Sequence, residues 1–82
     1  MATAVTSAWA KVSTSCTNFA VQNIERTLLR VYLVATTGSA PTGEVGFKLG
    51  ADDFLSMTVT AQDLYLKAPN GDTVAEVYHD GT

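Results

Sequence analysis

The sequence predicts a small all-β protein, an antiparallel β-sandwich or barrel of six to eight short strands. Apolar and polar residues alternate at period two in most segments, and no segment keeps a helical period. Gly, Pro, Asn and Asp interrupt these segments at nearly regular intervals, which is typical of small sandwiches and barrels. The 82 residues suffice for one domain. We expect it at residues 8–82, after a flexible Thr/Ala-rich N-terminal arm at residues 1–7.

The longest β-rich apolar run, residues 27–37, is the predicted central strand. Leu29, Val31 and Leu33 share one of its faces at period two, and the opposite face is also mostly apolar. The same alternation predicts six further strands, at residues 8–13, 18–23, 46–50, 54–60, 64–68 and 73–79. We therefore expect seven strands, with the other six arranged around the central one.

Turn signals separate the predicted strands. The strongest is Pro-Asn-Gly-Asp at residues 69–72, because Asn-Gly supports positive φ and Pro ends a strand; it predicts a hairpin from residue 64 to residue 79. Residues 23–26 contain no Gly and predict a slightly longer loop that forms a second hairpin with the central strand. The remaining loops and turns are expected at residues 14–17, 38–43, 51–53 and 61–63.

The charge balance argues against nucleic acid as a partner. The net charge is −3, and the five basic residues are scattered, whereas phosphate binding needs a cluster. Charged residues make up only 16% of the chain, so the polar surface consists largely of small uncharged groups that suit contact with another protein. No targeting segment is visible, and no apolar run approaches the ~18–20 residues of a membrane span. We expect no membrane partner.

No catalytic, metal or cofactor site can be assembled from the sequence. The single cysteine, Cys16, excludes an internal disulfide and a Cys-based zinc site, and it has no basic neighbour. The single histidine, His79, precedes Asp80, but adjacent residues on a strand point apart and no nucleophile motif accompanies them. The acidic residues 52, 53 and 72 lie in turns without a calcium-binding pattern. We therefore expect a protein that is not an enzyme and has no cofactor.

A series of short motifs resembles the small β proteins encoded among the structural genes of tailed bacteriophages. In order, it contains an aromatic-opened strand, a Gln-Asn turn, an apolar strand, an Ala-Pro loop, a Gly-x-x-Leu strand and an aromatic-containing strand, at residues 8–12, 21–23, 29–33, 40–41, 46–49 and 64–68. The resemblance implies a virion structural protein, most specifically a capsid decoration or stabilisation protein that binds the head lattice. It implies the major capsid protein or other virion proteins as partners, and the host cytoplasm as the location before assembly. It supplies no catalytic residues.

The N-terminal arm is the expected contact with the lattice, because its backbone groups need partners once they leave water. Self-association into trimers is expected from the local threefold symmetry of shells. The expected partner-interface residues are Ala2, Thr3, Ala4, Val5, Thr6 and Trp9.

Two other functions remain open on the sequence. A tail-fibre or adhesin-type module that binds a glycan or receptor should show an exposed aromatic platform with flanking carboxylates or amides. A decoration protein should instead show a broad, flat contact with little charge. A toxin or inhibitor that acts on a host protein is the third possibility. The aromatic residues considered for a platform are Trp9, Tyr32, Tyr65 and Tyr78.

Overall fold

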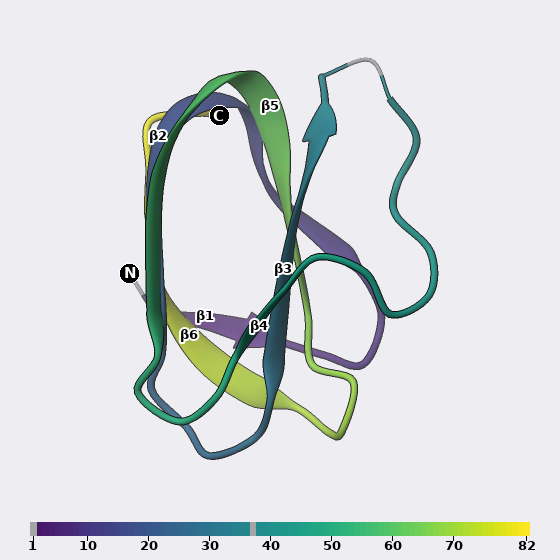
Figure 1. Cartoon of the computed structure of the whole chain (residues 1–82), viewed down its shortest axis with the longest axis vertical. Helices are drawn as coiled ribbons and strands as arrows, with labels where there is room; N and C mark the ends of the chain where they lie inside the picture. Colours follow the sequence, from purple (N-terminus) through teal and green to yellow (C-terminus); the bar gives the residue numbers. More distant parts are fainter. Residues whose placement is uncertain (1, 37) are drawn as a thin grey trace.

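The computed structural model describes residues 2–36 and 38–82, which form six β-strands and no helix (Figure 1). All the paired strands are antiparallel and belong to one curled sheet with the order β1-β6-β2-β5-β3-β4. The predicted all-β antiparallel class is therefore confirmed. The strands are β1 (Ala2–Val5), β2 (Ala10–Asn23), β3 (Leu29–Ala35), β4 (Phe47–Leu49), β5 (Phe54–Lys67) and β6 (Thr73–His79).

The two longest strands, β2 and β5, are paired neighbours and arch over together at one end of the molecule (Figure 1). Each bends at a non-glycine residue with positive φ, Ser15 at 54° and Ala61 at 44°. The register of the pair shifts in the same region, between Lys11 and Asn18. The sequence predicted a loop and a turn at these places. They are bulges instead, which bend a strand sharply without ending it.

The bends separate the sheet into two halves that share β2 and β5. In the first half, residues 54–58 of β5 pair with β2, whose other side pairs with β6. In the second half, residues 62–67 of β5 pair with β3. The two halves face each other across the core, so one sheet gives the protein the layered arrangement of a half-barrel (Figure 1).

Three predictions about strand pairing are wrong. The turn at residues 69–72 is present, with Gly71 at φ 129°, but β6 pairs with β1 and β2 and not with β5. β2 and β3 do not form a hairpin either, because β5 lies between them. The central strands are β2 and β5, and β3 is fifth in the order. Its second apolar face is covered by the loop before β4, where Gly46 lies against the Val31 carbonyl and the Tyr32 ring.

Residues 2–5 of the segment expected to be a flexible arm belong to the sheet, and residue 1 lies outside the described residues. Ala2–Val5 forms β1, which runs along β6 with Val5 opposite Thr73. Val5 is buried, and the Thr6 carbonyl accepts a hydrogen bond of 2.8 Å from the Ala68 N–H. The segment buries little by itself, but the open edge of β6 supplies partners for its backbone groups.

The inward-facing apolar side chains of the core are buried to different degrees. Leu29 and Val31 of β3 are fully buried, as their predicted inward face requires. Leu33, on the same face and nearer the arch, is only partly buried. The other partly buried apolar residues that pack on the core are Val12, Leu55, Met57 and Val59.

Candidate interaction surface

The outer face of β6, β2 and β5 carries the two most exposed large hydrophobic side chains among the described residues. Phe54 on β5 is 61% exposed and Tyr78 on β6 is 63% exposed. They lie on either side of β2, where Gln22 is opposite Phe54 and Ala20 is opposite Tyr78. The small Ala20 side chain leaves space between the two rings. We call the surface made by Ala20, Gln22, Phe54, Glu76 and Tyr78 the outer aromatic face.

This surface is hollowed into a shallow groove of about 170 Å³. The groove is lined by the two aromatic rings, the Gln22 amide and the Glu76 carboxylate, with Ala20 at its base. Glu76 is the one charged residue of the outer aromatic face. Mostly apolar concave surfaces with a few polar groups are the usual form of a binding site. The arrangement suits an apolar or ring-shaped ligand surface.

The exposure of Phe54 was not predicted, although the sequence contains a signal for it. Leu55, Met57 and Val59 alternate with Phe54, Ser56 and Thr58, so a strand that turns the three aliphatic side chains inward turns Phe54 outward. The structure has this alternation, with Leu55 partly buried and Phe54 exposed. A large aromatic residue on a hydroxyl-rich outer face was the sign of a contact surface.

The predicted interface residues do not share one surface in the structure: some are exposed and others are buried. Ala2 and Ala4 are exposed on β1, and Ala2 lies opposite Glu76, so β1 extends the outer aromatic face by one strand. Thr3 is half-buried and Val5 is buried in the core, because they occupy the inner face of β1. Thr6 is exposed just beyond β1.

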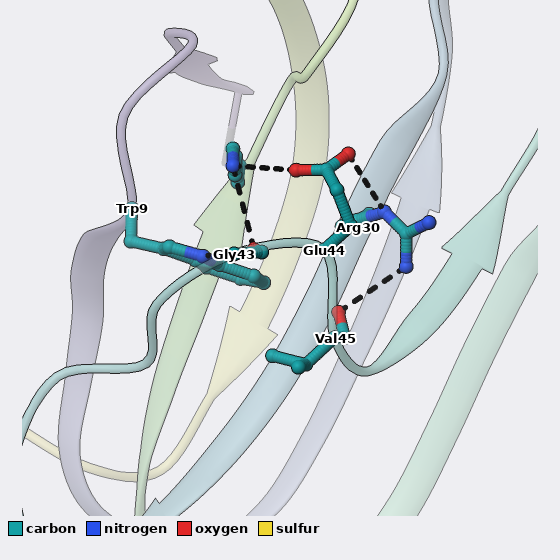
Figure 2. A network of polar contacts seen from close by, with 6 residues as sticks. Trp9, Arg30, Gly43, Glu44 and Val45 are labelled. Atoms are coloured by element: carbon teal, nitrogen blue, oxygen red, sulfur yellow. Dashed lines mark hydrogen bonds and ion pairs between the residues drawn. The ribbon is translucent and has the colours of Figure 1, made fainter.

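Trp9, the last predicted interface residue, belongs to a different cluster, on the outside of β3 (Figure 2). Its indole N–H donates to the Gly43 carbonyl at 3.0 Å, and its ring lies 6.3 Å from that of Tyr32. The Lys67 ammonium lies 5.7 Å from the indole centroid, within cation–π range. Trp9 is therefore half-buried and serves to hold the loop before β4.

Glu44 completes this cluster with two ion pairs (Figure 2). One of its oxygens accepts from Lys67 Nζ at 2.6 Å, and the other lies 3.4 Å from Arg30 Nε. The hydrogen bond from Lys67, with help from Arg30, holds the pKa of Glu44 below its ordinary value. The Arg30 guanidinium also donates to the Val45 carbonyl. These contacts fasten residues 43–45 to β3 and β5.

The aromatic residues considered for a platform do not form one. Trp9 and Tyr32 are neighbours, but Tyr65 is buried and Tyr78 lies on the outer aromatic face. The platform that the structure does contain, Phe54 with Tyr78, has the flanking amide and carboxylate that a glycan module requires.

The candidate reactive residues are held in structural roles. Asp80 accepts hydrogen bonds from the backbone and side chains of Thr17 and Asn18, so it does not orient His79. Burial raises the pKa of the Cys16 thiol, which disfavours the thiolate. Within residues 2–36 and 38–82, no three His, Cys, Asp or Glu side chains gather in a way that could hold a metal ion.

Comparison with known proteins identifies no relative: no family model, no curated protein and no solved structure matches the chain. Across the described part of the chain, no helix is long and apolar enough to span a membrane.

Proposed function

We propose that this protein is a structural protein of a tailed-bacteriophage virion that decorates or stabilises the head by binding the capsid lattice through its outer aromatic face. The observation that carries the proposal is the exposure of Phe54 and Tyr78 on one nearly uncharged sheet face. Large exposed aromatic residues that flank one another are typical of protein contact surfaces.

The energetics of this surface favour a wide protein contact. Burial of one exposed aromatic side chain contributes roughly 1.5–3 kcal/mol at most. Little desolvation opposes the contact, because Glu76 is the one charged residue of the outer aromatic face. The exposed Ala2 and Ala4 extend the surface across β1 without adding charge. The phage head as partner comes from the sequence resemblance, with the major capsid protein as the molecule bound.

Co-sedimentation with capsids assembled without this protein tests the proposal. Phe54→Ser and Tyr78→Ser should each weaken binding by about tenfold or more, since each removes over ~1.4 kcal/mol of apolar contact. Val45→Ser is the matched control, because Val45 is an exposed apolar residue of the loop before β4. It should bind as the parent protein does. Equal binding by all three variants would remove the outer aromatic face from the proposal.

A glycan-binding module, as in a tail fibre or adhesin, is the second candidate, and one observation favours it. The Gln22 amide and the Glu76 carboxylate line the groove between the aromatic rings, which is how polar groups fix the orientation of a sugar stacked on a ring. Screening against host polysaccharides distinguishes the two functions. Gln22→Ala should abolish glycan binding but leave lattice binding within about twofold, because a single half-buried amide adds little to a wide apolar contact.

A further inference from the structure

The bends in β2 and β5 leave one long stretch of sheet edge open. The first half of β5, residues 54–58, pairs with β2 on one side. β3 pairs with β5 only from Gln62 to Lys67. Residues 54–58 therefore have β2 on one side, and residues 54–60 have no described strand on the other. Figure 1 shows this half of β5 running with β2, away from β3.

The hydrogen bonds of β2 show which backbone groups of β5 point toward the open edge. The Asn23 N–H donates to the Asp53 carbonyl at 3.0 Å, so the backbone groups of Asn23 point toward β5. Because these groups alternate along an antiparallel strand, Val21 and Phe19 also point toward β5. Asn18 has the opposite parity, so its backbone groups should point toward β6. Its carbonyl does so and accepts a hydrogen bond of 3.2 Å from the N–H of Asp80, the residue after β6.

The residues of β5 opposite Val21 and Phe19 are Leu55 and Met57. Their backbone groups point back to β2, so those of Phe54, Ser56 and Thr58 point to the open side. A row of N–H and C=O groups at a sheet edge is a template for another strand.

Nothing in the sequence protects this edge. Residues 54–60 read Phe-Leu-Ser-Met-Thr-Val-Thr, without a charge or a proline. Uncharged β-prone edges of this length aggregate unless they are covered. Leu55, Met57 and Val59, which lie on the inner face of the same stretch, are only partly buried. A strand laid along the edge would pair the backbone and complete the burial of these three side chains.

We propose that the open edge, residues 54–60, pairs with the same edge of a second copy of the chain, antiparallel across a twofold axis near Met57. In this register Met57 faces its own counterpart, and Leu55 of each copy faces Val59 of the other. Apolar residues then meet on the inner face, while Ser56 meets Thr58 on the outer face. Ser56 and Thr58 carry the open backbone groups, as the hydrogen-bonded pairs of this register require.

The charge of the edge selects a second copy as the occupant. Like charges opposite each other destabilise a strand pair, so an edge that pairs with itself must be free of charge, and this one is. Isologous twofold contacts are also the commonest in homo-oligomers. The twofold pair replaces the trimer expected from shell symmetry and stands independently of the capsid proposal.

Sedimentation velocity over a range of protein concentrations is the first test. The parent protein should form a species of twice the monomer mass. Ser56→Lys places like charges at the pairing edge and should leave the protein monomeric. Ser7→Lys, at an exposed residue outside the strands, makes the same charge change and should dimerise as the parent does. A monomer at every concentration, a trimer, or a dimer that survives Ser56→Lys overturns the proposal.

Disulfide trapping is the second test and does not depend on dimer affinity. Across the proposed axis the two copies of residue 57 form a pair without backbone hydrogen bonds, with Cα atoms ~4.5 Å apart, which a disulfide spans. Met57→Cys should therefore give a covalent dimer under mild oxidation. Val59→Cys faces Leu55 and should not, and the parent should not because Cys16 is buried. Equal cross-linking of the two variants also overturns the proposal.

Discussion

Asp80 accepts two hydrogen bonds from Thr17, one from the backbone N–H at 2.7 Å and one from the hydroxyl at 2.6 Å. Asn18 adds a backbone and a side-chain donor, each at 3.1 Å. One carboxylate thus ties the end of β6 to β2 beside the bulge at Ser15. These donors, led by the Thr17 hydroxyl, hold the pKa of Asp80 far below its ordinary value.

We expect this contact to make stability depend on pH in acid. A carboxylate with a depressed folded-state pKa stabilises the fold fully above its unfolded pKa of about 3.9, and loses that stabilisation as the pH falls toward the folded pKa. The difference in Tm between the parent and Asp80→Asn should therefore be largest at neutral pH, begin to shrink below about pH 4, and continue to shrink as the pH is lowered further. A constant difference in Tm across this range would show that the charge of Asp80 is not involved.

The positive φ of Ala61 predicts a stabilising substitution. A left-handed backbone conformation destabilises the fold by roughly 1–2 kcal/mol at a non-glycine residue, and Gly removes this strain. The greater conformational entropy that Gly gives the unfolded chain offsets roughly 0.5–1 kcal/mol of that gain. Ala61→Gly should therefore raise the free energy of unfolding by up to about 1 kcal/mol in urea denaturation. Thr60→Gly, one residue earlier and without positive φ, should lower it. A loss in both variants would contradict the bulge geometry.

The unequal burial of two leucines on β3 predicts unequal costs for two similar truncations. Leu29 and Leu33 share the inner face of β3, but Leu29 is fully buried and Leu33 only partly. Leu29→Ala should cost ~2–5 kcal/mol of unfolding free energy, and Leu33→Ala clearly less. Equilibrium denaturation at a protein concentration low enough to keep the chain monomeric measures both. Equal costs would show that the partial exposure of Leu33 does not reduce its contribution to the core.

Loss of the Glu44 ion pairs should change the fluorescence of Trp9 but should barely change the thermal stability. Glu44→Gln weakens the hold on Lys67, whose ammonium lies 5.7 Å from the Trp9 ring. Trp9 fluorescence should change, while Tm stays nearly constant because Glu44 is half-exposed and solvent screens such pairs. Asp72→Asn, an equal charge change in an exposed turn, should leave the fluorescence unchanged. A large fall in Tm for Glu44→Gln would contradict this.

The sequence predicted the faces of the strands much better than their pairing. In β2, for example, period-two alternation puts Phe19 and Val21 on one face, and both are buried. It could not reveal that Ser15 and Ala61 bend strands without ending them. Both residues lack the Gly signal that normally marks a positive φ, and a bulge and a turn share the same short polar composition.

The pairing errors have the same origin. A strong turn at residues 69–72 predicts a hairpin only if both flanking strands lie in the same half of the sheet. Because β5 bends at Ala61, its second half lies across the core from the part of β2 that binds β6. Half of the candidate site was within reach of the sequence: Tyr78 was considered, and the parity of Leu55 implied that Phe54 faces outward. That Phe54 and Tyr78 lie close together on either side of Ala20 could not be predicted without the strand order.

The pairing of β1 with β6 bears on how the chain folds. Among the described strands, only β3 and β4 are neighbours in both the chain and the sheet. All other pairings bring together distant segments, so chain entropy must be lost before most contacts form, and such topologies fold in milliseconds to seconds. During synthesis, β1 has no sheet to join until Thr73–His79 has left the ribosome. Val5 stays exposed until then, so the N-terminal strand, although made first, is among the last to join the sheet.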